Sequence, residues 1–363
     1  MNLLLFNLAT DKTHVTLAFG LRWVEELARH FSHIDVVTMY EGPHELPSNV
    51  TVWSVGREKG FSEPRRIIEF YRILFAILRR KSIDVAFTHM IHSFAVLFWP
   101  ISKLMGIKNL LWYAHGAVPI GLRFAHAAVD QVVSSTPEGF RLSSHKVAYI
   151  GQGVDVGTFV HESIGRHDHE EFRILSVGRI SPVKGLDALL DALEQWKGSS
   201  SRQWRLDLVG GPTSPLEENY FAQLKQRAQR LSNGGKICFH GRLEPVQIRQ
   251  FLTNADVFVN LSRTGSLDKA IVEAMMCGCL VLSCNEAFCA IAKHEGFPEC
   301  CVTPTATDVA AKLEWVVALD ETGRAMLGKR VAEIAVRDHS LDGFIARLAT
   351  ILHSMTNQKI AAA

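Results

Sequence analysis

The 363-residue chain lacks features that would place it across a membrane or on a nucleic acid. No apolar run reaches the roughly 18 residues that a membrane-spanning helix needs. The amino terminus, Met1 to Phe6, has no basic region, so it predicts a first strand rather than a secretory signal. A net charge of +2 gives no support for a nucleic-acid partner. With 47% hydrophobic and 21% charged residues, the composition is that of a soluble globular protein.

Cysteine is absent from the first half of the chain, where a secreted protein of this size could carry disulfides. The seven cysteines are residues 238, 277, 279, 284, 289, 300 and 301. Their odd number and the missing signal favour a reducing cytoplasm, and several fall in predicted core segments, where free cysteine acts as a small hydrophobe. Cys277 and Cys279 have no second Cys/His pair at zinc-site spacing, so we expect neither a metal nor another cofactor.

The chain is long enough for two domains, each with its own core. Strand and helix patterns alternate over residues 1–157, and a polar, histidine-rich stretch at 158–171 predicts a linker. A second α/β array occupies 172–337. Ser340 then precedes a final amphipathic helix, within 338–363. We find no repeats or low-complexity segments.

Residues 256–284 carry the most informative pattern. They predict a buried strand at 257–260, a polar loop, a helix from about Asp268 and a second buried strand at 280–284. Ser266, at the end of the loop, is a good candidate for the N-cap.

The charges in this helix point to a ligand. Lys269 lies in the first turn, where the helix dipole is already positive, so an anion such as phosphate would complete the site. Glu273 lies among apolar residues and would need a partner such as a sugar diol. The alternative is a solvated Lys269–Glu273 pair at spacing four on a surface helix.

A second segment favours the ligand. Residues 172–178 form an apolar strand, followed by a loop that carries Arg179 and Lys184 and then by an amphipathic helix. In open α/β sheets ligands bind at the carboxyl ends of strands, where these cations lie. Two further strand-to-glycine turns follow, at Gly210-Gly211 and at Gly241-Arg242.

In their order along the chain, these motifs resemble those of glycosyltransferase family 4, which comprises retaining, nucleotide-sugar-dependent enzymes of the GT-B fold. The matching segments are Val177-Gly178-Arg179 with Lys184-Gly185, Val209-Gly210-Gly211, Phe239-His240-Gly241-Arg242, Ala255-Asp256-Val257-Phe258-Val259 and Val272-Glu273-Ala274-Met275-Met276-Cys277-Gly278. The amino-terminal half is similar more loosely, through Leu111-Trp112-Tyr113-Ala114-His115, 134–140 and 150–155.

The resemblance implies two Rossmann-like α/β/α domains that face each other across a cleft, with a carboxyl-terminal helix crossing back onto the first domain. It implies that Arg179 and Lys184 neutralise the leaving diphosphate, that Glu273 holds the ribose and that His115 orients the sugar. The remaining residues expected to bind the donor are Gly178, Gly210, Gly211, Arg242, Gly265, Ser266, Leu267, Asp268 and Lys269. A nucleotide diphosphate-sugar is then a substrate and no metal is expected.

One position departs from the family pattern. The family often carries two glutamates eight positions apart, and here the second is Glu273 while the first is replaced by Gly265. Since the first glutamate commonly contacts the transferred sugar, those contacts do not carry over. Asp268 or the Ser266 hydroxyl could replace them.

The first domain offers less specific candidates. His115 follows a predicted strand and can donate to a sugar hydroxyl or to the leaving phosphate oxygen. His89 and His92 follow another strand end and could line an acceptor cleft, although a role as ligands is disfavoured. Residues 11–13 (Asp-Lys-Thr) stand where the family often has a glycine-rich loop, which is missing here.

Residues 63–81 predict a helix with an apolar, aromatic body, six cations and two acidic residues. Such a helix is typical of a membrane surface, and the alternative is a core helix with a basic outer face.

We therefore expect a glycosyltransferase with a glycan or lipid-linked acceptor, active in cell-surface polysaccharide or glycolipid synthesis. We expect it in the cytoplasm, with an anionic membrane surface reached through residues 65–81. The alternatives are a non-catalytic nucleotide-sugar-binding subunit of an envelope-assembly complex, or a nucleotide-sugar epimerase of the same fold.

Overall fold

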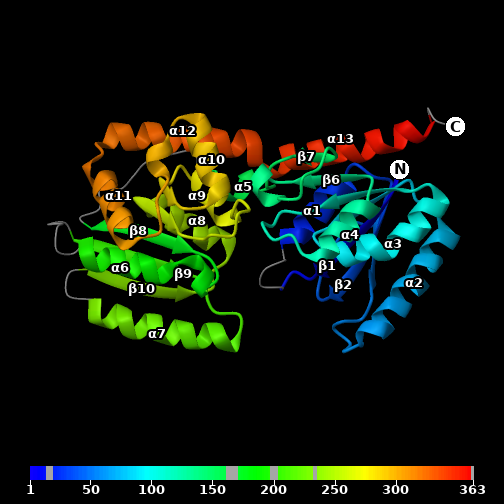
Figure 1. Cartoon of the computed structure of the whole chain (residues 1–363), viewed down its shortest axis with the longest axis horizontal. Coiled ribbons are helices and arrows are strands. Elements are labelled where there is room, and N and C mark those ends of the chain that lie inside the picture. Colours follow the sequence, from blue (N-terminus) through cyan, green and yellow to red (C-terminus); the bar gives the residue numbers. More distant parts are fainter. Residues whose placement is uncertain (14–18, 161–170, 197–202, 232–234, 361–363) are drawn as a thin grey trace. The chain divides into compact units, whose positions relative to one another are not determined.

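The computed structural model describes residues 1–13, 19–160, 171–196, 203–231 and 235–360. It divides into two compact units (Figure 1): unit 1 is Met1–Gly153 with Leu341–Ala363, and unit 2 is Val154–Ser340. Residues 154–157 thus belong to unit 2. Most of the expected linker, residues 161–170, lies outside the described residues.

Unit 1 is built on a parallel sheet that has seven strands within the described residues, in the order β3-β2-β1-β4-β5-β6-β7. The strands are β1 (Asn2–Thr10), β2 (His33–Glu41), β3 (Val50–Ser54), β4 (Val85–His89), β5 (Lys108–Trp112), β6 (Gln131–Ser134) and β7 (Val147–Tyr149). The central strands are buried on both faces, as expected for a parallel sheet covered by helices. The strand expected at the amino terminus is confirmed.

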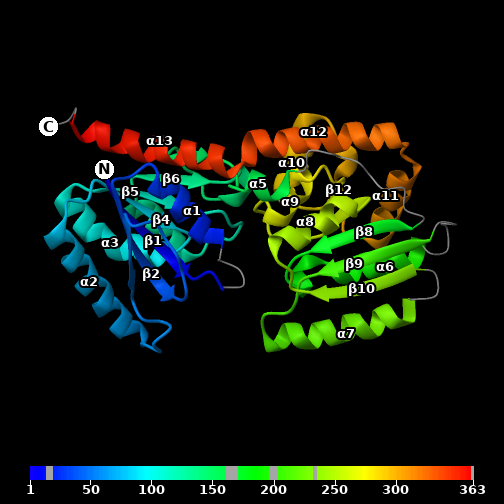
Figure 2. The same ribbon diagram turned by 180° about the vertical axis from the view of Figure 1, so that it is seen from behind.

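Helices cover both faces of this sheet. One layer is α2 (Glu63–Arg80), α3 (His92–Met105) and α4 (Ile120–Ala128); α1 (Phe19–Ala28) and α13 (Leu341–Ile360) lie side by side on the other face, which Figure 2 shows from behind. Trp23 of α1 packs on Phe344 of α13, with ring centroids 4.2 Å apart. The final helix therefore returns to the first unit, as expected. A short 3₁₀ turn is η1 (Pro137–Gly139).

Unit 2 is a second parallel sheet, with five strands in the described residues, in the order β10-β9-β8-β11-β12. The strands are β8 (Phe172–Val177), β9 (Trp204–Val209), β10 (Gly235–Gly241), β11 (Val257–Asn260) and β12 (Val281–Ser283). The helices are α5 (Val156–Phe159), α6 (Leu186–Trp196), α7 (Pro215–Leu231), α8 (Pro245–Asn254), α9 (Lys269–Met276), α10 (Glu286–Glu295), α11 (Ala306–Ala318) and α12 (Glu321–His339), with 3₁₀ turns η2 (Pro182–Lys184) and η3 (Pro298–Cys300). The two parallel-sheet α/β units confirm the predicted fold class.

The chain order of the strands defines a switch point in unit 2. From β8 the chain adds β9 and β10 on one side, and it then returns to place β11 and β12 on the other. The helices that follow β8 and β11 therefore leave the sheet on opposite faces and open a crevice between the carboxyl ends of these strands, which is where ligands bind in open α/β sheets. Arg179 and Lys184 follow β8, whereas Asp268 follows β11.

No helix in the described ranges is both long enough and apolar enough to cross a membrane. All seven cysteines lie in the described part of the chain and are free thiols, and Cys277, Cys279 and Cys300 are buried in the core of unit 2.

Candidate functional site

The strand-end loops of unit 2 meet because parallel strands end at one edge of the sheet. At Gly178 and Gly210 the backbones approach so closely that a β-carbon on Gly210 would lie 1.8 Å from the Gly178 carbonyl oxygen. Both glycines have positive φ, 146° and 130°, which side chains of other residues rarely allow. The structure thus brings the predicted turns after β8 and β9 together. Arg242, after β10, is exposed and donates to the Pro212 carbonyl oxygen.

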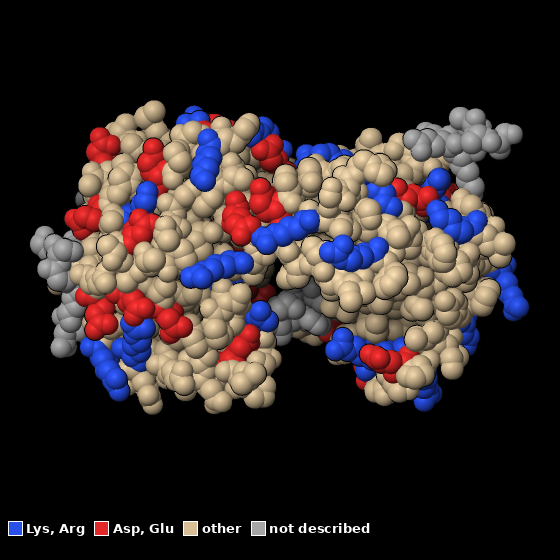
Figure 3. All heavy atoms as spheres, viewed as in Figure 1, with Lys and Arg blue, Asp and Glu red and all other residues tan. Residues whose placement is uncertain are grey.

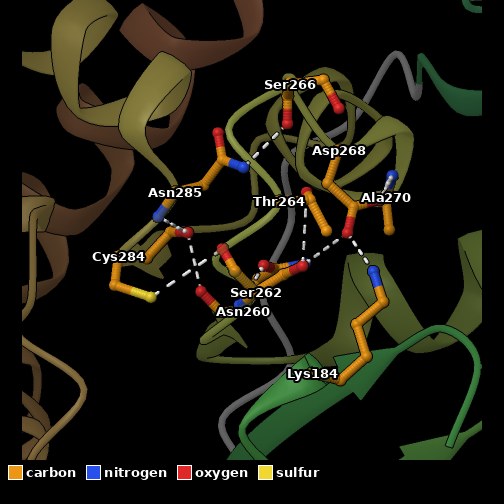
Figure 4. Close-up of polar contacts among 10 residues, drawn as sticks. Lys184, Asn260, Ser262, Thr264, Ser266, Asp268, Ala270, Cys284 and Asn285 are labelled. Atoms are coloured by element: carbon orange, nitrogen blue, oxygen red, sulfur yellow. Dashed lines mark hydrogen bonds and ion pairs between the residues drawn. The ribbon is translucent and has the colours of Figure 1, made fainter. Parts of the chain in front are cut away.

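An ion pair bridges the switch point. The Lys184 Nζ contacts Asp268 Oδ2, which also accepts from the Asn260 amide nitrogen at 3.0 Å (Figure 4). The side chains of Lys184 and Asp268 are only 18% and 16% exposed. Burial alone would raise the pKa of Asp268, but the Lys184 ammonium and the hydrogen bonds from Lys184, Asn260 and Ala270 hold it below its ordinary value. Asp268 is therefore a carboxylate.

Asp268 also begins α9. Its Oδ1 accepts from the Ala270 backbone N–H at 3.4 Å, and it has the extended backbone of an N-cap. The expectation that Ser266 caps this helix is wrong, because the loop continues two residues further. Helix amides and a lysine are the donors that a phosphate group would use. Here a carboxylate of the chain itself already accepts from both.

A second set of hydrogen bonds, from residues at and after the end of β12, fixes the loop between β11 and α9. The Asn285 side-chain amide donates to the Ser266 carbonyl oxygen at 2.8 Å, while its Oδ1 accepts from Phe288 N–H and caps α10. The Ser283 hydroxyl donates to the Asn260 carbonyl oxygen at 2.7 Å. Figure 4 shows the contact of Asn285 with Ser266 on the side of the loop away from Lys184. The loop is thus held at both ends.

Arg179 is placed by an acidic partner in the first turn of α7. Its Nε lies 3.3 Å from Glu217 Oε1, and Glu217 also accepts from the Thr213 N–H and hydroxyl. Burial raises the pKa of Glu217, but the Thr213 hydrogen bonds and the Arg179 charge bring it below its ordinary value. Because 45% of the Arg179 side chain is exposed, the guanidinium remains accessible to a ligand.

Lys269 and Glu273 form an ion pair one turn apart on α9, with Nζ and Oε1 separated by 3.4 Å. The pair is not the solvated surface pair of the alternative, since only 11% of the Glu273 side chain is exposed. Burial raises the pKa of Glu273, and the nearby Lys269 only partly offsets this effect. A buried carboxylate whose charged form is disfavoured is a common feature of binding sites.

The other residues predicted to bind the donor in this loop differ in which of their groups could contact a ligand. Gly265 is buried and has a φ of 79°, a conformation that a glutamate at this position would adopt only with strain. The Leu267 side chain is buried in the core, so only its backbone could face a ligand. Asp268 is engaged by three donors, which leaves the half-buried Ser266 hydroxyl as the less committed replacement for a sugar contact.

Sequence reasoning missed Asn260, Glu217, Thr213 and Asn285. Asn260 is the last residue of a buried strand and Asn285 precedes a helix after another strand, so strand-end position and N-cap chemistry could have identified both. No local signal marks the pairing of Glu217 with Arg179, because it depends on how the loop after β8 packs beside the first turn of α7.

In unit 1, His115 follows β5 and is exposed. Its Nδ1 accepts from the Ala117 backbone N–H at 3.0 Å, so in the neutral ring the proton is on Nε2. The backbone N–H of His115 is itself held by the Gly139 carbonyl oxygen. The side chain therefore presents a fixed N–H donor.

His89 and His92 are less suited to ligand contact. His89 is buried against Trp23, with ring centroids 4.8 Å apart, and burial lowers its pKa to about 4. The His92 ring lies against Gly121 of α4, where a β-carbon would come within 2.5 Å. Asp11 accepts from the Thr13 N–H and hydroxyl at 2.7 Å and closes its own turn.

In the described ranges, one group of side chains has the spacing of metal ligands. Ligand atoms of Asp207, Cys238 and His240 lie within 4.8 Å of one another on β9 and β10. The Arg205 Nε donates to both Asp207 oxygens, at 2.9 and 3.0 Å, and His240 Nε2 lies 2.6 Å from one of them. The guanidinium satisfies this carboxylate and opposes a second cation there.

Comparison with known proteins agrees with this geometry. Residues 160–332 match the family model for Glycosyl transferases group 1. No curated protein matches the chain in sequence. Among solved structures, HepE of Anabaena, determined with UDP and glucose, is 17% identical over 97% of this chain and 99% of its own, with a TM-score of 0.74.

Two other solved structures are similar over the whole length. The sucrose-phosphate synthase of Thermosynechococcus elongatus is 16% identical over 100% of both chains, with a TM-score of 0.77. An E. coli trehalose-6-phosphate protein bound with UDP-2-fluoro glucose is 12% identical over 97% of this chain and 99% of its own, with a TM-score of 0.73. The chain thus has the GT-B fold, and its residues 160–332 match the model of the Glycosyl transferases group 1 family.

Proposed function

We propose that the protein is a retaining, family 4 glycosyltransferase that moves a sugar from a nucleotide diphosphate-sugar to an acceptor hydroxyl. The observation that carries the proposal is the placement of Arg179 and Lys184 after β8, at the switch point of unit 2, with Lys184 beside the amino terminus of α9. Two cations and helix amides at one sheet edge fit a diphosphate. The match of residues 160–332 to a glycosyltransferase model supports the same assignment.

The cations act on the bond-breaking step. As the glycosidic bond breaks, the leaving diphosphate gains charge, so Arg179 and Lys184 stabilise the transition state more than the ground state. Arg179 reaches the diphosphate from its contact with Glu217, and Lys184 from its contact with Asp268. These carboxylates hold the cations in place before the donor binds, which reduces the reorganisation needed for reaction.

In this proposal Glu273 binds the ribose of the donor, and His115 contacts its sugar or the leaving phosphate oxygen. The buried Glu273 carboxylate accepts from the ribose hydroxyls, and these donors stabilise a charge that burial disfavours. Lys269, paired with Glu273, adds positive charge at the helix amino terminus. His115 donates from Nε2 to a sugar hydroxyl or to the leaving phosphate oxygen. No metal or other cofactor takes part, since the two cations already supply the countercharge.

We place the reaction in cell-surface polysaccharide or glycolipid synthesis, with a glycan or lipid-linked acceptor. In this setting the protein is cytoplasmic and binds peripherally to the inner face of the membrane. The cations of residues 65–81 support a membrane contact, because the α2 residues that pack inward are Phe70, Ile73, Leu74 and Ile77 and the arginines lie on the outer side.

Two observations favour a second candidate, a non-catalytic subunit that binds a nucleotide-sugar. The first glutamate of the family pattern is replaced by Gly265, in a backbone conformation that suits glycine. The charge of Lys184 is also neutralised by Asp268 before any ligand binds. The third candidate is a nucleotide-sugar epimerase of the same fold. It would use the same donor site but release an epimerised sugar nucleotide instead of transferring the sugar to an acceptor.

The deciding experiment is mass spectrometry of reactions with UDP-, GDP-, dTDP- and ADP-sugars, with and without acceptor glycans, followed over time. Transfer, or slow hydrolysis of one donor that is lost in Lys184→Ala, supports the proposal. Donor binding measured by calorimetry without any turnover favours the binding subunit, and an epimerised sugar nucleotide favours the epimerase. If no nucleotide-sugar binds, the assignment of this site is wrong.

A further inference from the structure

The helical layer of α2, α3 and α4 leaves large apolar side chains uncovered. Leu104 is 88% exposed, Ile120 72%, Ile68 70% and Phe124 63%. Seven exposed apolar residues of this layer, these four among them, form what we call the apolar face: Ile68, Phe75, Trp99, Leu104, Met105, Ile120 and Phe124. Single exposed hydrophobic residues are normal on proteins, but a group on adjoining helices marks an interaction surface.

The contacts between the helices place these residues on one side. The Tyr71 hydroxyl of α2 donates to the Leu97 carbonyl oxygen of α3, and Ile68 and Phe75 lie one turn before and after Tyr71. His92 of α3 packs on Gly121 of α4, next to Ile120. The three helices also share one face of the sheet. The apolar face therefore spans all three helices.

The part of this face formed by α3 and α4 carries charge of one sign, whereas α2 also carries Glu63 and Glu69. Residues 85–129, which include α3 and α4, contain no aspartate or glutamate. Arg123 stands beside Phe124, and Lys103 beside Leu104; Lys103 shares Asp130 with Lys108. Arg79, Lys81 and Arg123 have no acidic partner within the described residues. In the space-filling view (Figure 3) the surface over α3 and α4 is mostly uncharged, and both cations and acidic side chains stand at its border.

We propose that the apolar face is a docking surface for an anionic lipid bilayer. Trp99, Phe75 and Phe124 are side chains suited to the boundary between headgroups and acyl chains. The bordering cations lie where anionic headgroups would meet them. The proposal does not depend on sugar transfer, and it extends the membrane contact from the cations of residues 65–81 to the apolar residues of α2, α3 and α4.

A second copy of the chain fits this face less well. A two-fold dimer presents the same surface from both partners, so each Arg123 would meet cations and no acidic residue of α3 or α4. Like charges brought together without partners oppose association. A bilayer with anionic lipids supplies both the apolar phase and the countercharge.

The test is co-sedimentation of the full chain, without nucleotide, with phosphatidylcholine vesicles and with vesicles that also contain phosphatidylglycerol. We expect binding to the anionic vesicles at low ionic strength and release as salt is added. The double variant Leu104→Ser with Phe124→Ser should bind at least about tenfold more weakly, because two exposed apolar anchors are lost. Lys103→Gln with Arg123→Gln should lose about fivefold for each cation.

The matched control is Leu216→Ser with Met326→Ser. These residues are 82% and 69% exposed in unit 2, outside the apolar face, and their loss should leave vesicle binding unchanged. Brominated lipid should quench tryptophan fluorescence in the wild type and much less in Trp99→Phe, because the other tryptophans are buried or half-buried.

Three outcomes would overturn the proposal. The wild type could stay in the supernatant with anionic vesicles at low salt, or the double variants could bind as the wild type does. Sedimentation equilibrium without lipid could also show a dimer that Leu104→Ser with Phe124→Ser dissociates, in which case the face is an interface between two copies of the chain.

Discussion

Lys184→Ala should impair both stability and turnover, for separate reasons. Removing one partner of a buried ion pair costs about 3–5 kcal/mol. Since Lys184 and Asp268 are 18% and 16% exposed and Asp268 keeps the hydrogen bonds from Asn260 and Ala270, we expect about 2 kcal/mol. For a unit of this size that lowers the melting temperature by about 4–8 °C. Loss of a preorganised cation at the leaving diphosphate should also lower turnover by about 10²-fold or more.

A double variant separates the two effects. Adding Asp268→Asn to Lys184→Ala removes the unpaired charge while keeping an N-cap residue, so the melting temperature should recover most of its loss. Turnover should stay low, because the cation is still missing. Differential scanning calorimetry and a single-turnover assay with the best donor measure the two quantities. If the double variant regains turnover as well as stability, Lys184 acts only by neutralising Asp268, and its catalytic role is refuted.

Four further substitutions test the rest of the site. Arg179→Ala should also lower turnover by about 10²-fold, with little change in melting temperature because its side chain is 45% exposed; near-normal turnover at saturating donor would remove it from the reaction. Glu273→Ala should weaken calorimetric binding of the nucleoside diphosphate by about 1.5–3 kcal/mol, and unchanged affinity would exclude the ribose contact. Because the pKa of Glu273 is raised in the folded protein, its contribution to stability is present below the unfolded pKa and is lost as pH rises through the folded pKa. Glu273→Gln should therefore gain in stability relative to the wild type from pH 4 to pH 7. Parallel stability curves for the two proteins would contradict this. Asn285→Ala should destabilise the protein by about 0.5–2 kcal/mol, because α10 loses its N-cap. Loss of the contact with the Ser266 carbonyl oxygen should raise KM for the donor more than it lowers kcat. A change in melting temperature alone would show that the Ser266 contact has no effect on donor binding.

Much of the candidate site in unit 2 could be predicted from local sequence patterns. The predicted strands at 172–178 and 257–260 and the helix carrying Leu186, Leu189 and Leu193 are confirmed, because apolar periodicity reports which side of an element is buried. Arg179 and Lys184 were found from their position after a strand. Their roles in the reaction stay predictions.

Other features needed the tertiary structure. The N-cap of α9 was assigned to Ser266 instead of Asp268, since both residue types cap helices and only the backbone path decides between them. The pairing of Lys184 with Asp268 joins residues 84 positions apart, and no local pattern specifies such a contact.

The sequence by itself determined the alternation of strands and helices, and with it the edge of each sheet at which polar loops gather. This is possible because local periodicity and turn chemistry act over a few residues. Only the tertiary structure decided which carboxylate meets which cation, that Glu273 is buried, and that Trp99, Leu104 and Phe124 remain uncovered. Burial of a side chain depends on the neighbours that the rest of the chain brings to it, and those neighbours are distant in sequence.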